Sequence, residues 1–325
     1  MTTDERLAAL EAKMDALTAP PSDYYTSRYS GEEIDAAIAA VPGKAETAQL
    51  CNRNLLDNWY FGNSVNQRGQ TSYTANGYTV DRWSLYTDGG NVAIANEYLD
   101  IYSAKQYGHY LTQVIAPELA KALAGKTVTY SVLAADSDAV FSAIINKDGV
   151  YIDGFTIAPN TVSCKTWTFP SSTDVSFGFG ANAAGHVRPI AVKLELGSQQ
   201  TLAHQDADGN WVLNEVPDYG EQLRRCQRYF VRLSGDSYWS VVGIARCYGT
   251  NNATLVFWLP VPMRTLPTIV ASGLTVNGVA VSSITIDQYN PTCLKCKGTL
   301  ATNVSAGIYI IEQYGSGYVD ASADL

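Results

Sequence analysis

Apolar residues near the N-terminus recur at the spacing of a helix that packs against other helices. They lie three, four and three positions apart, and they are Leu7, Leu10, Met14 and Leu17. This a/d spacing predicts a helix over residues 4–17 and a coiled-coil oligomerisation segment over residues 1–19. Docking of the helix on its own chain is the alternative, because two heptads are marginal as a free coiled coil. Pro20 and Pro21 end the helix, which favours association between identical chains.

The next segment, residues 20–50, is expected to be a connector with a second short helix. Ser30 is suited to cap that helix, and acidic residues follow in its first turn, where the helix dipole favours them. A narrow apolar stripe runs from Ile34 to Val41, and Pro42-Gly43 ends it.

Near residue 51 the pattern changes to short apolar runs bounded by turn residues, which predict strands. Examples are "KTVTYSVLA", "CKTWTF" and "RPIAVKLELG". One helix is expected from Pro117, with Gly125 as its C-terminal cap. Many short strands with almost no helix predict a β-sandwich over residues 51–200.

A bridge follows over residues 201–225, with a hairpin turn in "QDADGNW" and a short helix beginning at Pro217. Runs such as "ATLVFWLPVP" and "GIYIIEQYGSGYV" then predict a second β-sandwich over residues 226–325. The fold class is therefore mainly β.

The composition limits the partners. The formal net charge is −9, and no cluster of Lys and Arg is visible along the chain. Nucleic acids and anionic membranes recruit such clusters, so neither is expected as a partner. In residues 226–325, six Lys and Arg stand against five Asp and Glu, which favours an uncharged or lightly charged ligand. No segment has the pattern of a secretory signal or of a membrane-spanning helix, so synthesis in the cytoplasm without membrane insertion is expected.

The six cysteines are too few and too scattered for a disulfide framework, and reduced thiols are expected. "CLKC", from Cys293 to Cys296, lacks the second pair or His that zinc needs and the βαβ setting of a redox site. These cysteines are expected to be small buried or tolerated residues in a reduced protein. A site assembled from three chains around an axis stays open as the alternative.

No catalytic or metal-binding motif is found in the sequence. The histidines, which lie far apart, are His109, His186 and His204. The acidic pairs Asp136/Asp138 and Asp206/Asp208 could flank a glycosidic bond, but both are expected to be solvated turns, where Asp makes local hydrogen bonds. No loop has calcium-ligand spacing. We therefore expect no enzyme activity, no cofactor and no metal.

Several segments resemble a known family when they are taken in order. They are "NLLDNWYFGN" at 54–63, "GYTVDRW" at 77–83, "LAGKTVTYSVLA" at 123–134, "VKLELGSQQT" at 192–201, "YGEQLRRCQRYF" at 219–230 and "DASADL" at 320–325. This series resembles tail-fibre proteins of tailed bacteriophages and prophages that carry a carbohydrate-binding-module-like jelly roll. The resemblance covers residues 51–325 in pieces.

The resemblance implies a structural and adhesive protein of the virion tail that binds a bacterial surface glycan for host recognition. It implies a homotrimer, joined to other tail or baseplate proteins through its N-terminal region. The jelly roll would span residues 51–200, and the receptor-binding domain would span residues 226–325. A tail-borne polysaccharide-degrading enzyme and a free carbohydrate-binding adhesin are the alternatives. Whether the jelly roll binds glycan or only spaces the tip stays open.

Within this frame, residues 54–61 are expected to form the first strand, followed by a polar loop. "GYTVDRW" is expected to be a second strand with Tyr78, Val80 and Arg82 on one face. Arg68 and Arg82 are expected to hold loops through hydrogen bonds to carbonyl groups. The tryptophans expected in the core are Trp59 and Trp83.

Aromatic residues of the C-terminal domain are the main indication of a binding site in the sequence. Those beside small polar residues are Tyr238, Trp239, Tyr248, Trp258, Tyr289, Tyr314 and Tyr318. A sugar ring can stack its C–H face on an aromatic ring while its hydroxyls bond at the edge. Half or more of these residues are expected to be core, Trp258 among them. The predicted glycan contacts are Tyr238, Trp239, Tyr248 and Asn251.

Overall fold

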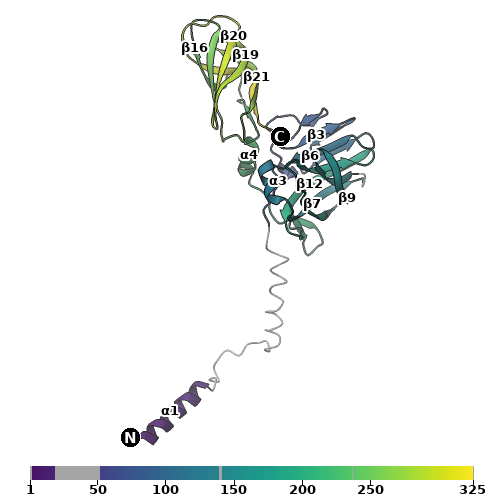
Figure 1. Cartoon of the computed structure of the whole chain (residues 1–325), viewed down its shortest axis with the longest axis vertical. Helices are drawn as coiled ribbons and strands as arrows, with labels where there is room; N and C mark the ends of the chain where they lie inside the picture. Colours follow the sequence, from purple (N-terminus) through teal and green to yellow (C-terminus); the bar gives the residue numbers. More distant parts are fainter. Residues whose placement is uncertain (1, 19–51, 139–140, 236, 325) are drawn as a thin grey trace. The chain divides into compact units, whose positions relative to one another are not determined.

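The computed structural model divides the chain into two compact units, Met1–Leu50 and Cys51–Leu325 (Figure 1). The described residues are 2–18, 52–138, 141–235 and 237–324. In the first unit, α1 spans Thr3–Thr18 and confirms the predicted helix. Leu7 and Leu10 are 60% and 61% exposed there. The predicted connector over residues 20–50, and the side chains of Met14 and Leu17, lie outside the described residues.

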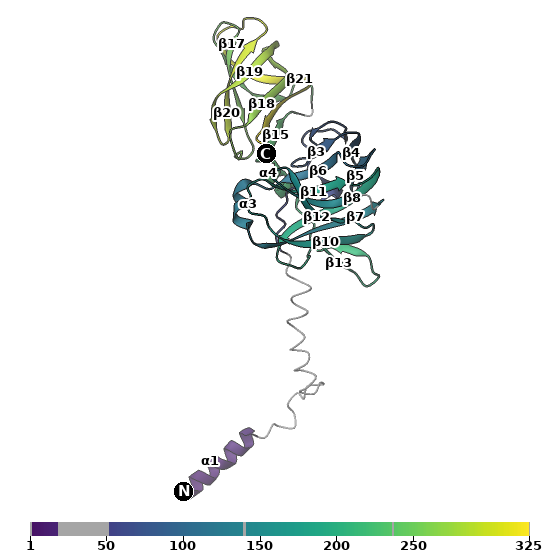
Figure 2. The same cartoon turned by 45° about the vertical axis from the view of Figure 1, so that its right-hand side comes forward.

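The second unit begins with two six-stranded antiparallel sheets (Figures 1 and 2). In spatial order, the first sheet contains β1 (Ser72–Tyr73), β4 (Gly90–Ile94), β5 (Leu99–Ser103), β12 (Gly185–Leu196), β7 (Thr127–Ser137) and β10 (Thr161–Thr168). The second sheet contains β2 (Gly77–Tyr78), β3 (Ser84–Thr87), β6 (His109–Val114), β11 (Val175–Ala181), β8 (Phe141–Lys147) and β9 (Val150–Thr156). We call this part the two-sheet domain.

A single hydrophobic core joins the two sheets. Tyr130 of β7 and Phe177 of β11 belong to different sheets and meet edge to face, with ring centroids 5.3 Å apart. Such aromatic pairs add stability beyond the area that they bury. Trp59 and Trp83 are 2% and 0% exposed, which confirms that both are core residues.

The segment that opens the two-sheet domain is not the predicted strand. Leu55 donates its N–H to the carbonyl of Leu194 at 2.8 Å, and Tyr60 forms an isolated bridge with Ala191. The chain therefore runs beside β12 without a continuous ladder, and it then enters the short 3-10 helix η1 (Phe61–Asn63).

Asn58 explains this departure from strand geometry. Its backbone φ is 51°, in the left-handed region that an extended strand does not use. Its buried amide accepts the N–H of Val65 at 2.7 Å and donates to the carbonyls of Val65 and Asp81 at 2.9 and 2.8 Å. The indole of Trp83 donates to the carbonyl of Asn58 at 3.0 Å. A side chain that binds nearby backbone groups competes with strand pairing, and here it wins.

"GYTVDRW" is also not a strand throughout. β2 ends at Tyr78, and Thr79 then donates from both its N–H and its hydroxyl to the carbonyl of Trp83, which closes a turn. Arg82 has a φ of 74° within that turn, and Val80 and Arg82 are both buried. The prediction of one strand face was wrong because the alternation in this sequence belongs to a buried turn.

The short helices and the hairpin follow the sequence closely. α3 spans Pro117–Leu123, and Gly125 adopts the left-handed φ of 75° that a terminal glycine allows, as predicted. α4 spans Tyr219–Gln227 and begins two residues after Pro217, because the Asp218 side chain caps it by accepting the Glu221 N–H at 2.7 Å. None of the helices in the described parts is both long and apolar enough to cross a membrane.

The predicted hairpin consists of β13 (Ala203–Gln205) and β14 (Trp211–Leu213). Leu202 and Ala203 are buried in the core of the two-sheet domain. The first half of the predicted bridge therefore packs as part of that domain.

The C-terminal domain is a closed barrel and not the predicted second sandwich. Its six strands are β16 (Val241–Cys247), β17 (Asn252–Trp258), β20 (Cys293–Leu300), β19 (Val279–Asn290), β18 (Thr268–Val276) and β21 (Gly307–Ser322). β21 pairs with β16 on one edge and with β18 on the other, so the sheet has no free edge there. β15 (Phe230–Leu233) adds a further short pairing to β21.

The barrel interior is filled by alternate residues of these strands. Leu255 and Phe257 of β17 point inward and are fully buried, so the next residue must face outward. Trp258 is accordingly 55% exposed, and the prediction that it packs in the core was wrong.

Candidate functional sites

A long bulge in β21 shapes one exposed site on the barrel. Ser272 of β18 pairs with Tyr318, whereas Leu274, two residues on, pairs with Gln313. Residues 314–317 therefore leave the ladder opposite Gly273, where the two chains come so close that a Cβ on Gly273 would lie 2.8 Å from the Gly317 Cα. Bulges of this kind re-aim side chains, and this one exposes Tyr314.

Gln313 fixes the neighbouring loop between β15 and β16. It is 2% exposed, and its amide accepts the Gly235 N–H at 2.6 Å and donates to the carbonyls of Gly235 and Ser237 at 2.9 and 2.7 Å. A buried amide with this many partners fixes Gly235 and Ser237 relative to β21. Tyr238 and Trp239 belong to this loop.

The bulge and the loop together form a cluster of three rings, Tyr238, Trp239 and Tyr314. The ring centroids lie 4.7 Å apart for the two tyrosines and 5.4 Å from Trp239 to each of them, all in edge-on geometry. Their exposed fractions are 48%, 51% and 52%. A hydrogen bond with Tyr314 raises the pKa of Tyr238 above its ordinary value, so the Tyr238 hydroxyl stays protonated near neutral pH. The cluster offers flat apolar surface beside hydroxyl groups.

The other two predicted contacts lie at the opposite end of β16. Tyr248 follows the last residue of this strand, whereas Trp239 precedes its first. A strand of seven residues spans about 20 Å, so the two aromatic residues do not share one sugar site. Tyr248 is half exposed and bonds to the Thr254 hydroxyl at 2.8 Å, and Asn251 accepts the Leu300 N–H through its backbone carbonyl.

A polar seam connects the two-sheet domain to α4. Asp57 lies between two arginines, with Arg82 Nε 3.1 Å from one carboxylate oxygen and Arg225 Nε 2.7 Å from the other. Gln113 accepts the Asp57 N–H and donates to the Asp57 carbonyl, each at 2.7 Å. Arg82 also donates to the carbonyl of Val114 at 2.9 Å, which confirms its predicted loop-holding role.

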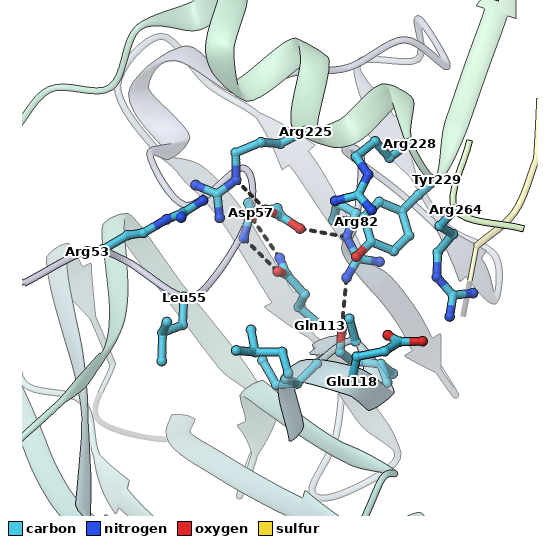
Figure 3. A pocket seen from close by; sticks show the side chains of 14 residues that line it. Arg53, Leu55, Asp57, Arg82, Gln113, Glu118, Arg225, Arg228, Tyr229 and Arg264 are labelled. Atoms are coloured by element: carbon cyan, nitrogen blue, oxygen red, sulfur yellow. Dashed lines mark hydrogen bonds and ion pairs between the residues drawn. The ribbon is translucent and has the colours of Figure 1, made fainter. Parts of the chain in front are cut away.

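A cavity of about 370 Å³ opens beside this seam (Figure 3). Five arginines line it: Arg53, Arg82, Arg225, Arg228 and Arg264. This convergence corrects the expectation that the chain has no cationic cluster. Most of these residues come from separate parts of the sequence. Two of the five are close together along the chain, with Arg225 in the last turn of α4 and Arg228 just after the helix ends.

Arg68 links the two-sheet domain to the C-terminal end of the chain, which follows β21 of the barrel. Its guanidinium binds Asp81 at 3.0 Å and Asp324 at 2.6 Å, and it lies over the Phe230 ring with its Cζ 3.8 Å from the ring centroid. Both carboxylates are buried. The predicted bonds from Arg68 to carbonyl groups are replaced by these two carboxylates.

Asp81 should make stability depend on pH. Burial raises the pKa of Asp81 to about 6, although hydrogen bonding to Gln67 and the charge of Arg68 act in the opposite direction. Because this pKa lies above the unfolded value, the stability due to Asp81 is greatest below about pH 4 and is lost as pH rises through 6. We expect the free energy of unfolding of the natural chain, minus that of Asp81→Asn, to fall by up to about 3 kcal/mol between pH 4 and pH 7.

Urea unfolding followed by tryptophan fluorescence at pH 4, 5, 6 and 7 measures this difference. His109 provides an opposite trend, because burial lowers its pKa to about 4, but it is common to both proteins and cancels. A difference that stays constant with pH would contradict the prediction.

The remaining titratable candidates form separate local contacts. His109 bonds to the Thr87 hydroxyl at 2.9 Å, and His186 bonds to Asp100 at 2.8 Å. His204 bonds to Asn214 at the hairpin. No group of three or more His, Cys, Asp or Glu side chains within the described ranges is arranged to hold a metal ion.

The acidic pairs differ from each other. Asp206 accepts the N–H groups of Asp208 and Asn210 at 3.0 and 2.8 Å, as expected for a turn. Asp136 lies within β7 and forms an ion pair with Arg188 at 2.6 Å. The prediction of a turn at Asp136 was therefore wrong.

The "CLKC" residues lie in β20. Cys296 faces the barrel core and is fully buried, as expected, and burial raises its pKa to about 12. Cys293 is half-buried.

A scan against protein-family models found no matching family, and a search of curated proteins found no match.

Proposed function

We propose that this chain is a structural and adhesive tail-fibre protein that binds a bacterial surface glycan. The observation that carries the proposal is the three-ring cluster of Tyr238, Trp239 and Tyr314, half exposed and held in place by the buried amide of Gln313. Exposed aromatic rings with hydroxyl groups at their edges suit a sugar ring, and rings held in place lose little entropy on binding. The segments that resemble tail fibres supply the biological setting.

The proposal includes a jelly-roll topology for the two-sheet domain and a parallel trimer. Two antiparallel sheets over one core are compatible with the jelly roll. The trimer is supported by the exposed Leu7 and Leu10 on α1. It is also supported by exposed isoleucines on the outside of the barrel, where Ile244 pairs with Ile310 across β16 and β21. Exposed apolar strips of this kind mark contact surfaces.

Light scattering and a glycan array test the proposal on the full chain. We expect a mass of three chains and binding to a subset of bacterial surface glycans that persists in chelator. A mass of one or two chains would contradict the trimer. New reducing ends after incubation with host polysaccharide would favour the enzyme alternative, and antibody labelling that misses intact virions would favour a free adhesin.

A further inference from the structure

The arginine-lined cavity beside α4 carries more positive charge than its neighbours neutralise. Its lining contains five arginines against two carboxylates, Asp57 and Glu118. Asp57 is already shared by Arg82 and Arg225. An excess of cations around one cavity is unexpected in a chain with a net charge of −9.

Three of these arginines hold no counter-ion. Within the described residues, the side chains of Arg53, Arg228 and Arg264 form no ion pair and no hydrogen bond, although Arg264 lies 5.8 Å from the Tyr229 ring centroid. Like charges that converge without a partner repel one another, so the cluster is destabilising unless something anionic binds there.

A buried donor is also left without a partner. Arg82 is 2% exposed, it lines the cavity, and its Nη1 has no hydrogen-bond partner in the described structure. Its other donors bind Asp57 and the Val114 carbonyl. The guanidinium is fixed further by the Tyr229 ring, whose centroid lies 3.5 Å from Cζ. A buried and rigid N–H that has no acceptor costs free energy, because it has lost its hydrogen bond to water.

We propose that this cavity binds a compact oxyanion, a carboxylate or a phosphate, carried by a small polar ligand. Guanidinium groups match the planar, two-oxygen geometry of these anions. The volume of about 370 Å³ lies in the lower part of the range for small-molecule sites. Leu55, Ile115 and Leu119 line the same cavity and supply an apolar wall for the body of the ligand. If the proposed function holds, the ligand is an acidic or phosphorylated sugar unit of the bacterial glycan.

Isothermal titration calorimetry at low ionic strength tests the site with inorganic phosphate, glucuronate and, as the neutral comparison, glucose. We expect phosphate or glucuronate to bind with 1:1 stoichiometry per chain and glucose not to bind at this site. The anion that binds with the higher affinity shows whether the site prefers a phosphate or a carboxylate. Absence of binding by both at millimolar concentration would overturn the proposal.

Arg228→Gln and Arg53→Gln test whether the anion binds in this cavity, and Arg246→Gln is the matched control. Arg246 is an exposed arginine on the outer face of β16, away from the cavity lining. Removing one charge-assisted bond should weaken anion affinity about tenfold in either cavity variant. The control should stay within about twofold, because only the long-range charge changes. An equal loss of anion affinity in all three variants would contradict the assignment of binding to this cavity. Unchanged affinity in all three would contradict it as well.

Adhesion to host cells separates this inference from the proposed function. Anion binding by the cavity in a protein that does not adhere would refute the adhesin and leave the oxyanion site standing. Adhesion that continues while anion binding to the cavity is absent would refute the oxyanion site alone.

Discussion

Replacing Arg68 by Met should lower the free energy of unfolding by about 3–5 kcal/mol at pH 7. The substitution leaves two buried carboxylates, Asp81 and Asp324, without the cation that they share. Met keeps apolar contact with the Phe230 ring beneath it, so the loss reports the charge more than the packing. Burial raises the pKa of both carboxyl groups, and the loss should therefore shrink as the pH is lowered from 7 towards 4.

Arg188→Met provides the control for this prediction. Arg188 also binds two carboxylates, Asp100 and Asp136, but these are more exposed, at 29% and 52% of their side chains. Exposed pairs of this kind contribute about 1 kcal/mol or less. Urea unfolding of both variants measures the contrast, and equal losses would show that burial of the Arg68 site is not what makes it strong.

Replacing Trp239 by Ala should reduce adhesion to host cells by at least about thirtyfold. Trp239 contacts both tyrosines of the three-ring cluster and is half exposed, so it is the largest ring surface that the cluster offers. Aromatic anchors of this kind contribute about 2 kcal/mol or more to binding. In a trimer the loss would be repeated in each copy and enlarged by avidity.

Two further variants decide whether the cluster is the site. Trp258→Ala removes an equally exposed tryptophan elsewhere on the barrel, and Tyr248→Ala removes the aromatic residue at the far end of β16. Both should adhere nearly as well as the natural chain, with circular dichroism confirming that all three variants fold. Strong loss in Tyr248→Ala with normal adhesion in Trp239→Ala would move the contact to the other end of the barrel.

Local features of this chain were predictable from its sequence. Periodicity and capping residues act over one or two turns, which is why α1, α3 and the β13–β14 hairpin were anticipated with nearly correct bounds. The exposure of Tyr238 and Trp239 followed from the small polar residues beside them. Trp59 and Trp83 were expected in the core, and both are buried.

Predictions from the sequence were wrong where side-chain hydrogen bonds replace strand pairing and where an apolar residue of a strand faces outward. Asn58 binds backbone groups of Val65 and Asp81, so an apolar segment typical of a strand takes an irregular path. Trp258 lies in a strongly apolar run and still faces outward, because the inward positions of β17 are already taken by its neighbours. Apolar character alone does not decide which face of a strand is buried.

The mainly β character of the chain, its N-terminal helix, most of its strands and the exposure of Tyr238 and Trp239 could therefore be predicted from local sequence patterns. Three features became visible only in the folded chain: β18 and β21 close the barrel, a bulge brings Tyr314 to Tyr238 and Trp239, and five arginines line one cavity. The physical reason is distance along the chain. Periodicity records which face of an element is buried, but pairing between remote strands and the convergence of remote charges depend on contacts that no local pattern encodes.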